Sequence, residues 1–480
     1  MKYEAVIGIE MHAELNTKTK IFCGCKTDYG AQVNTQCCPI CIGLPGTLPT
    51  LNKKVVEYAV RMGLACGCTI NKETKHDRKN YFYPDLPKAY QISQYDIPLC
   101  ENGEISFYVG EDKKTVRNGR IHIEEDAGKL LHDNRFSGTL VDFNRCGIPL
   151  IEIVSQPDMH SPEEARAYLE ALKAVLECLG ICNCRMQEGN IRCDVNVSIR
   201  PAGSEQLGNR VEMKNVNTFS GAVRGIEYEI ARQIEVVEAG GHIEQETRRW
   251  DDDRGESLSM RSKEDAQDYR YFPEPDLVPI RLDDAYVEGI RSSLPELPIS
   301  KYERYWKENG LTPYEASMLS TDKDKAAFFE ACLEKDATLA KQICNWILGD
   351  IAKLQNERGC TVQSLGIDPA ALCELIVLTQ KGTLSSTSAK TVFDEMLSTG
   401  KAPGVIVEEK GLAQVNDEQA LLGIVEEVLA ANAGPVQDYH GGKTNVLGFL
   451  VGQCMKRSKG KGNPQLFNKL LAQKLNEQKE

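Results

Sequence analysis

The chain has 480 residues and carries 57 lysines and arginines against 70 aspartates and glutamates, which gives a formal net charge of -13. A chain of this length exceeds a single hydrophobic core, so we expect two to four domains. The sequence has no apolar run long enough for a membrane span, and its first residues lack the apolar stretch of a secretory signal, which favours a cytoplasmic protein without membrane contact.

The first predicted element is a strand over residues 7–14, in which apolar and polar side chains alternate. Positions 7, 9 and 11 are apolar, whereas Glu10, His12 and Glu14 occupy the opposite face. The same alternation, with acids repeated on the polar face, recurs in residues 121–126, 151–153, 191–200 and 210–214. We predict that these strands form a sheet whose polar face holds Mg²⁺ and a polyphosphate, because a merely solvated face would carry fewer acids.

Two cysteine pairs, Cys23-x-Cys25 and Cys38-x-x-Cys41, follow this strand, with twelve residues between them. Such spacing is typical of a structural Zn²⁺ site with tetrahedral thiolate ligands. The alternative is a group of reduced, metal-free thiols, and the neighbouring Cys37 leaves the third ligand ambiguous. Because we expect a reducing compartment, the 18 cysteines of the chain favour metal ligands or small core residues over disulfides.

Residues 79–96 form a segment without helical or strand periodicity, in which five aromatic residues accompany prolines, lysines and carboxamides. We predict a rigid loop that presents polar groups to a pocket, the alternative being a structural loop whose polar atoms are satisfied internally. Residues 269–277 repeat this composition. Residues 247–264 contain four arginines that either hold phosphates or form a surface charge run: Arg248, Arg249, Arg254 and Arg261.

Three helices are predicted among these strands, the first over residues 54–64. The second begins at Ser161 as the N-cap, with proline at the first helical position, and runs over residues 161–179 to Gly180. The third covers about 221–239. The second and third helices are amphipathic, so we expect them to cover the apolar face of the sheet.

The pattern changes near residues 294–298, a proline-containing break after which helical periodicity dominates. The expected helices cover residues 301–309, 324–335, 337–357, 369–379, 386–399, 417–432, 445–456 and 464–476. A second break lies near residues 400–404. We therefore predict an α+β protein: an antiparallel-sheet domain over 1–293, an all-α domain over 294–404 and a small helical tail domain over 405–480.

The tail is basic although the chain as a whole is acidic. Residues 441–480 carry eight lysines and arginines against two glutamates, with a cluster at Lys456, Arg457, Lys459 and Lys461. A basic tail on an acidic body is typical of a protein that binds a phosphate backbone at one end. The alternative is a solvated appendage.

Common nucleotide-binding loops are missing from the sequence. Gly442-Lys443-Thr444 looks like the end of a P-loop, but Gln437 stands where that motif requires glycine. The sequence also has no GxGxxG, no GxSxG and no amidase signature. Any ATP chemistry therefore has to use the acidic sheet.

Together these segments resemble the B subunits of aspartyl/glutamyl-tRNA(Asn/Gln) amidotransferases. The resemblance rests on long motifs in the same order over nearly the whole chain, among them GIEMHAEL, CCPICIGLPGTLP, KNYFYPDLPKAYQISQYD, HIEEDAGK, RCDVNVSIR, EMKNVNTF, DYRYFPEPDL and GFLVGQCMKRSKGKGNP. It implies a catalytic cradle related to the glutamine synthetase core, followed by helical and tail domains that hold tRNA by its shape. It also implies a ligase reaction in which ATP activates the side-chain carboxylate of Glu-tRNA(Gln) or Asp-tRNA(Asn), and ammonia then forms the amide.

The resemblance further implies site residues. Those expected to act in catalysis and to bind Mg²⁺ are Glu10, His12, Glu125 and Glu152. Those expected on the ATP side are Asp194, Asn196, Glu212 and Lys214. Those expected to line the cavity where ammonia meets the aminoacyl end are Lys79, Tyr81, Asp85, Lys88, Tyr90 and Gln94.

Two of these assignments leave alternatives. Glu124 and Glu125 must point to opposite faces of a strand, and only the resemblance selects Glu125. His12 is an unusual ligand for Mg²⁺, which prefers oxygen, so it could bind a second ion or orient a carboxylate.

The implied partners are an amidase (the A subunit), which supplies ammonia, a small C subunit that completes a heterotrimer, and the misacylated tRNA. Two other hypotheses stay open. A stand-alone ATP-dependent carboxylate-amine ligase would use the same acidic sheet but leaves the basic tail unexplained. A non-catalytic, zinc-bearing RNA scaffold leaves the acidic strands unexplained.

Overall fold

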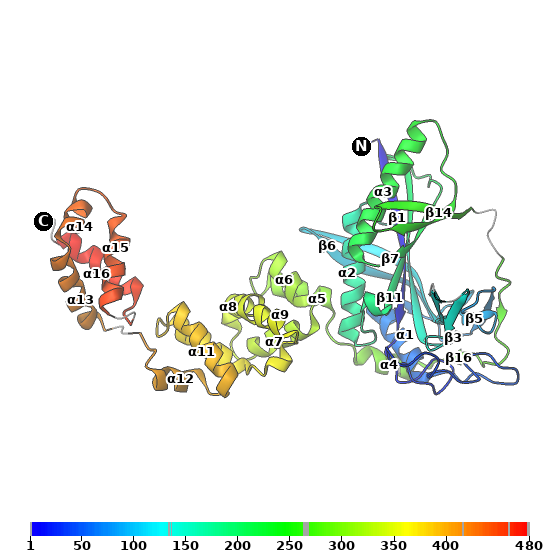
Figure 1. The fold of residues 1–480 in the computed structure, drawn as a ribbon, viewed down its shortest axis with the longest axis horizontal. Coiled ribbons are helices and arrows are strands. Elements are labelled where there is room, and N and C mark those ends of the chain that lie inside the picture. Colours follow the sequence, from blue (N-terminus) through cyan, green and yellow to red (C-terminus); the bar gives the residue numbers. More distant parts are fainter. Residues whose placement is uncertain are drawn as a thin grey trace. The chain divides into compact units, whose positions relative to one another are not determined.

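The computed structural model describes residues 2–132, 135, 137–262, 268–414, 417–458 and 461–477, and the side chains of residues 261 and 262 lie outside the description. The chain forms two compact units, Met1–Tyr302 and Glu303–Glu480. The first unit contains the sheet and the second contains helices only in its described part (Figure 1).

The first unit is built on a nine-stranded sheet in the order β14-β13-β12-β11-β1-β10-β7-β6-β2. Neighbouring strands are antiparallel except β12 and β13, which are parallel. The strands are β1 (Tyr3–Glu14), β2 (Thr69–Ile70), β6 (Cys100–Val109), β7 (Asp112–Glu125), β10 (Pro149–Ser155), β11 (Ile191–Pro201), β12 (Val211–Val216), β13 (Glu246–Asp251) and β14 (Glu256–Ser262). The predicted antiparallel α+β architecture is confirmed.

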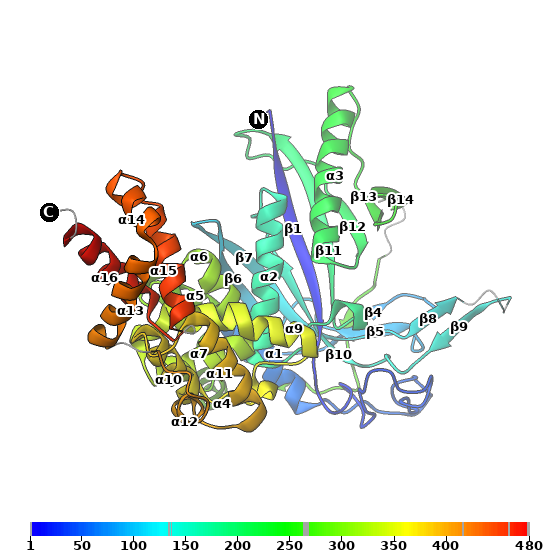
Figure 2. The ribbon, with the colours of Figure 1, turned by 60° about the vertical axis from the view of Figure 1, so that its left-hand side comes forward.

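The apolar faces of these strands join one hydrophobic core. Ile9 and Met11 of β1 and Val195 of β11 are fully buried in the same cluster as Leu169 and Leu172 of helix α2 (Pro162–Leu179). Helix α3 (Phe219–Glu238) packs on β11 and β12, and α1 (Lys53–Ala65) packs on β6 and β7 (Figure 2). The alternate, polar residues therefore face away from these helices, as their period of two predicts.

The helix signals in this unit are also confirmed. The side chain of Ser161 accepts a hydrogen bond from the backbone of Glu164 at 3.1 Å, and Gly180 ends α2 in the left-handed conformation at φ 67°. Helix α3 begins at Thr218, whose hydroxyl accepts from the backbone of Gly221 at 2.9 Å. A short helix, α4 (Asp284–Ser292), has no counterpart in the predicted set.

Three small sheets complete the first unit. They join β15 (Phe272–Pro273), β4 (Asp77–Asn80) and β5 (Tyr90–Ser93); β16 (Ile280–Arg281) and β3 (Glu73–Thr74); and β8 (Lys129–His132) and β9 (Thr139–Asp142). The pairing of β15 with β4 places the two predicted loops, 79–96 and 269–277, side by side although almost 200 residues separate them.

The second unit begins within α5 (Pro298–Lys307). Its other helices are α6 (Pro313–Ser320), α7 (Lys323–Leu333), α8 (Ala340–Trp346), α9 (Ala352–Arg358), α10 (Pro369–Gln380), α11 (Ser386–Thr399), α12 (Pro403–Lys410), α13 (Glu418–Ala431), α14 (Ala433–His440), α15 (Val446–Arg457) and α16 (Pro464–Glu477). A π-helical turn, Ile347–Ile351, joins α8 to α9. The eight predicted helices are present, whereas α6, α12 and α14 were not expected.

Helices α13 to α16 share a hydrophobic cluster of their own, which includes Leu421, Leu450, Phe467 and Leu471. Helix α12 instead packs against α10 and α11. The predicted boundary at residue 405 therefore falls inside a helix that packs with the preceding group. Within the described ranges, none of the helices combines the length and apolar character that crossing a bilayer requires.

Candidate functional site

A row of four polar side chains crosses the exposed face of the central sheet. The register places His12 of β1 opposite Arg192 of β11 and Glu152 of β10, and Glu152 opposite His122 of β7. Because the alternate residues of these strands fill the core, all four side chains lie on the polar face. His122 was not among the predicted residues, although the buried Ile121 and Ile123 on either side of it gave the signal.

Two histidines and two glutamates of this face form a compact group. The Nε2 atom of His12 lies 3.2 Å from Glu124 and 3.8 Å from Glu152, and Nε2 of His122 lies 3.0 Å from Glu152 and 3.7 Å from Glu124. One ligand atom each from His12, Glu124 and Glu152 lie within 4.8 Å of one another. This donor set of two carboxylates and an imidazole fits a divalent cation.

The charges of this group depend on one another. Burial disfavours the imidazolium of His12, but the contact with Glu124 and the charge of Glu152 outweigh burial and raise the pKa of His12 to about 9. Burial likewise disfavours the carboxylates, but His122 and His12 hold the pKa of Glu152 at about 2, and the two histidines lower the pKa of Glu124. Both carboxylates are therefore charged at neutral pH. The imidazolium of His12 has to lose its proton before its ring nitrogen can bind a cation together with them.

The structure corrects one member of the expected group, because Glu125 lies on the opposite face of β7 from His12. Its side chain forms an ion pair with Lys88 and accepts a hydrogen bond from the backbone of Ile92 at 2.9 Å. Glu124, the neighbour that the strand alternation left as the alternative, is the one beside His12. The placement of Glu125 beside His12 and Glu152 was wrong.

The four residues expected on the ATP side gather around Glu10, one row further along the sheet. Asn196 donates a hydrogen bond to Glu10 at 3.0 Å. Lys214 forms ion pairs with Asp194 at 2.6 Å and Glu212 at 2.8 Å. Burial, reinforced by repulsion from Glu152, raises the pKa of Glu10. Glu10 is thus close enough to Glu152 to be affected by its charge, but it is not a member of the group formed by His12, Glu124 and Glu152.

An open hollow of about 440 Å³ lies over this face. Its lining includes Lys79, Tyr81, Asp85, Gln91, Glu124, Asp126, Arg192 and Asp194 together with His12. The first predicted loop, 79–96, forms one wall. The second loop, 269–277, contacts the first: the Lys79 ammonium lies 4.8 Å from the ring centre of Tyr269, and Tyr95 stacks on Tyr271 at 4.2 Å. Three of the six residues expected to line a single cavity, Lys79, Tyr81 and Asp85, are therefore here.

The other three cavity residues lie elsewhere. Lys88 and Tyr90 line a smaller hollow of about 210 Å³ behind the sheet, which Glu125 also lines. Gln94 lines neither hollow: it is buried, donates to Thr74 at 2.8 Å and accepts from the backbone of Ile123 at 3.0 Å. The prediction of one cavity for all six residues was wrong, because consecutive residues of β4, β5 and β7 point to opposite sides.

A third hollow, of about 720 Å³, adjoins the first. Arg145 and Arg192 line both, and the carboxylate of Asp126 lies between them, 3.1 Å from Arg145 and 2.9 Å from Arg192. The larger hollow is rich in carboxamides: Asn16, Gln36, Asn144, Asn183, Gln187, Asn190 and Asn217. Two adjoining hollows with a shared arginine–aspartate–arginine partition give room for two sizeable polar ligands.

The described side chains of the arginine-rich segment, residues 247–260, do not line these hollows. Arg248 is held by Glu246 at 2.6 Å and by the hydroxyl of Ser257 at 2.7 Å, which is a structural role. Arg249 and Arg254 lie near Asp251 on exposed parts of β13 and its following turn. The side chain of Arg261 lies outside the described residues.

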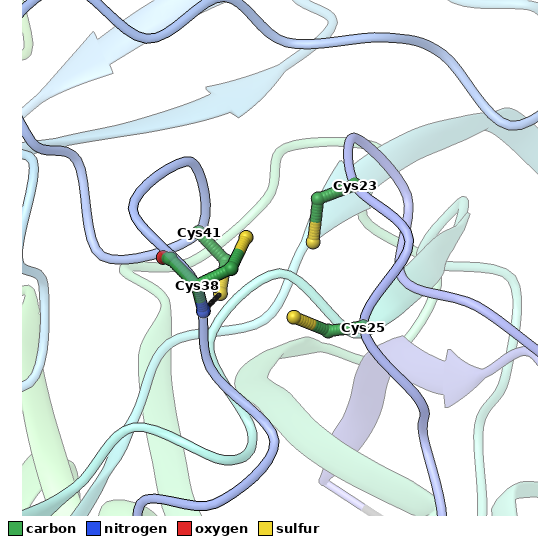
Figure 3. A group of neighbouring side chains, drawn as sticks. All are labelled: Cys23, Cys25, Cys38 and Cys41. Atoms are coloured by element: carbon green, nitrogen blue, oxygen red, sulfur yellow. Dashed lines mark hydrogen bonds between the residues drawn. The ribbon is translucent and has the colours of Figure 1, made fainter.

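The four predicted zinc ligands converge, as Figure 3 shows. The sulfur atoms of Cys23, Cys25, Cys38 and Cys41 all lie within 4.8 Å of one another. Tetrahedral Zn²⁺ with Zn–S bonds of about 2.3 Å places its sulfurs roughly 3.8 Å apart, so the separations of the four sulfurs exceed those of a bound site by about 1 Å at most. The thiol of Cys37 instead points to the backbone oxygen of Asn34 at 3.3 Å, which favours Cys38 as the third ligand.

We expect one zinc ion per chain at these cysteines. Elemental analysis of protein purified without chelators should give a stoichiometry near one, and a Cys38→Ser/Cys41→Ser variant should give a stoichiometry near zero. A Cys37→Ser variant is the matched control and should keep its zinc. Retention of zinc by the double variant would contradict the assignment.

Several basic side chains of the tail already have acidic neighbours. Ion pairs join Arg457 to Glu427, Lys469 to Glu418 and Lys474 to Glu426. Exposed pairs of this kind contribute at most about 1 kcal/mol, so phosphates can replace the carboxylates. Lys459 lies outside the described residues.

Comparison with known proteins gives matches over most of the chain. Residues 5–288 match the family model described as the GatB/GatE catalytic domain, and residues 327–475 match the model described as the GatB domain. The B subunit of the aspartyl/glutamyl-tRNA(Asn/Gln) amidotransferase of Caldicellulosiruptor bescii is 56% identical over 478 residues, 99% of both chains. The proteins of the same name from Clostridium tetani and Geobacter sulfurreducens are each 52% identical over 478 residues, 99% of this chain and at least 99% of theirs.

Proposed function

The chain belongs to the family of amidotransferase B subunits with a GatB/GatE catalytic domain, and from this premise we propose that it carries out the ATP-dependent amidation of Glu-tRNA(Gln), Asp-tRNA(Asn) or both. The observation that carries the proposal is the group formed by His12, Glu124 and Glu152, of which His12 and Glu124 line an open, charged hollow. Such a hollow suits a reaction that brings a polyphosphate to a carboxylate.

The chemistry requires two transfers. A carboxylate is a poor electrophile, so its oxygen first attacks the γ-phosphorus of ATP, the bond to the bridging oxygen breaks, and ADP leaves. Ammonia then attacks the activated carbonyl carbon, phosphate leaves with the bonding pair, and the nitrogen loses a proton to give the amide. Mg²⁺ bound at His12, Glu124 and Glu152 supplies positive charge that offsets the repulsion between the two anions.

The surrounding residues can place the two substrates. Arg192 and Lys79 bring cationic groups to the hollow that Glu124 lines, where an incoming carboxylate or phosphate needs them. Glu10, Asn196 and Lys214 belong to the ATP side in this proposal. Because ATP and an aminoacylated tRNA end each carry a nucleoside, the two hollows on either side of Asp126 suit one substrate each.

Ammonia has to reach this face without loss to water. We assign its supply to an amidase, the A subunit of the enzyme, which a small C subunit holds in a heterotrimer, because this chain has no amidase signature of its own. The hollow with Lys88, Tyr90 and Glu125 is a polar, half-enclosed space on the other side of β7 and belongs to the ammonia route in this proposal. The setting is the cytoplasm, where charged tRNA and ATP are available.

Reconstitution of the chain with both partner proteins tests this function. We expect glutamine-dependent conversion of Glu-tRNA(Gln) or Asp-tRNA(Asn) to the amide, with one ADP formed per amide and no reaction when ATP is omitted. Free glutamate or aspartate should not replace the acylated tRNA. Amide formation on a free acid would favour the stand-alone ligase, and tRNA binding without ADP formation would favour the non-catalytic scaffold.

A further inference from the structure

One lysine is completely enclosed at the base of the cysteine loops. Lys20 has an exposed fraction of 0%, and it is the only lysine among the buried polar residues of the described ranges. Its backbone N–H donates to the oxygen of Cys25 at 3.0 Å, which fixes it at the start of the loop that carries Cys23 and Cys25. Lysine is almost never fully buried without an anionic partner.

Within the described residues no carboxylate forms an ion pair with Lys20. Its ammonium group lies 3.6 Å from the sulfur of Cys41 and 3.4 Å from the backbone oxygen of Phe143. Glu125 lines the same small hollow; its Oε1 atom is engaged by Lys88 and by the backbone of Ile92, whereas its Oε2 atom lies beside Gly147, which also borders Lys20. Because this carboxylate forms no ion pair with Lys20, the closest anionic atom to the Lys20 ammonium among the described residues is the sulfur of Cys41.

The thiolate cluster, in contrast to Lys20, carries excess negative charge and needs a cation nearby. Zn²⁺ with four thiolates has a net charge of -2, and among the described residues the sulfur of Cys41 accepts only one backbone hydrogen bond, from Cys38 at 3.1 Å. Cys41 is buried, so the excess negative charge is costly unless a cation lies nearby. The buried ammonium of Lys20 and the buried thiolate of Cys41 can therefore neutralise each other.

The backbone of Gly147 lies beside both Lys20 and Cys41. Gly147 has φ +76°, and a Cβ atom there would lie 3.5 Å from Cβ of Cys41 and 3.7 Å from Cδ of Lys20. Its carbonyl oxygen accepts a hydrogen bond from Ile21 at 3.0 Å. The left-handed backbone at Gly147, a conformation that favours glycine, therefore lies between Lys20, the loop of Cys41 and the start of β10.

We propose that Lys20 is the counter-cation of the zinc–thiolate centre: it positions the thiolate of Cys41 and increases the retention of zinc by the chain. The inference rests on the zinc site proposed above. Lys20 also lines the hollow that contains Lys88 and Glu125. The contact between Lys20 and Cys41 therefore connects the zinc-binding loops to the wall of that hollow.

The test compares zinc affinity in the full-length chain and two variants. Lys20→Met keeps the length of the side chain and removes its charge, and we expect its zinc affinity, measured by competition with a chromogenic chelator, to fall about 10- to 100-fold. Lys18→Met is the matched control, since Lys18 is exposed two residues earlier on the same segment, and its affinity should not change. Equal zinc affinity in the Lys20→Met variant and the unaltered chain would overturn the proposed role of Lys20 but leave the zinc site standing. Absence of zinc from the unaltered chain would overturn both the zinc site and the role of Lys20.

A second measurement separates the charge effect from simple packing. In Co²⁺-substituted protein, removal of a cation beside a thiolate raises the energy of the sulfur electrons, so the sulfur-to-cobalt charge-transfer band should move to longer wavelength in Lys20→Met and not in Lys18→Met. If the Lys20→Met chain folds poorly, Lys20→Arg should retain both zinc and the band position. An unmoved band, or loss of zinc in Lys20→Arg as severe as in Lys20→Met, would show that Lys20 only fills space.

Discussion

Replacement of Glu124 by glutamine, or of His12 by alanine, should reduce ATP-dependent amidation of misacylated tRNA by at least 10²- to 10³-fold. Both changes remove a ligand from the group that His12, Glu124 and Glu152 form, and loss of metal-based charge stabilisation costs several kcal/mol in the transition state. The rate of amide formation at saturating ATP measures the effect. Glutamine hydrolysis by the partner amidase should persist, because its own site is untouched.

Glu125→Gln is the matched control for Glu124→Gln, since the two residues are neighbours on β7 and point to opposite faces. The Mg²⁺ concentration that gives half-maximal ADP formation should rise in the Glu124 variant and stay unchanged in the Glu125 variant. Glu125→Gln should instead affect amidation through the Lys88 contact. Near-normal amidation by both the Glu124 and His12 variants, or a Mg²⁺ requirement that changes only in the Glu125 variant, would contradict the site.

The strand periodicity in the sequence was sufficient to predict the polar face but not the identity of each partner on it. A period of two assigned Glu10, His12 and Glu152 correctly to one face, because each lies between buried apolar residues. It also required Glu124 and Glu125 to diverge. The buried Ile121 and Ile123 place His122 and Glu124 on the polar face, so the alternation favoured Glu124, and the choice of Glu125 came from the resemblance. Which residue of the neighbouring strand lies beside Glu124 is set by the long-range pairing of β7 with β10, and local sequence contains no register information of that kind.

The division of the loops between hollows was unpredictable for a related reason. Lys79 and Lys88 belong to one sequence segment with no periodicity, so their directions are set by the pairing of β4 with β5 and of β4 with β15. Arg145 and Asp126, which form the partition, become neighbours only when the chain returns from β9 to β10. In contrast, the cysteine cluster was predictable, because short metal knuckles bring their ligands together locally.

Helices were also predictable where local residues mark their ends, and not where they lack a clear pattern. Helix α11 occurs over the predicted residues, since Ser385 caps it and Gly400 ends it. Helices α6, α12 and α14 each have only eight residues, too short for a clear period. Helix α6 nevertheless has a local start signal that the prediction missed, the capping box of Thr312 and Glu315 with Pro313 between them. The second break, near residues 400–404, therefore marked the start of α12 and not the end of the helical group.

Truncation of the chain after Gln414 should remove most of the affinity for tRNA. The cut leaves α12 in place and preserves the backbone contact of Gln414 with Thr383 at 2.8 Å, while it removes α13 to α16, which have a separate hydrophobic cluster. Neutral substitution of Lys456, Arg457, Lys459 and Lys461 should have a smaller effect of the same kind. Each lost phosphate contact removes roughly 0.7–0.9 from the logarithmic salt slope of binding, so four contacts amount to about 3.

The matched control for these substitutions is Lys401→Gln with Lys410→Gln, two exposed lysines that precede the cut and pair with Glu409 and Glu395. Their loss should leave the salt slope within experimental error, because the prediction attributes phosphate contact to the tail and not to basic residues in general. Glutaminase activity of the partner without tRNA should be equal in all variants, which separates weakened tRNA binding from a damaged complex. An unchanged tRNA affinity and salt slope after truncation would mean that the ion pairs of Arg457, Lys469 and Lys474 with α13 serve only the tail itself, and that the tRNA is held by the acidic body through shape and 2′-hydroxyl contacts.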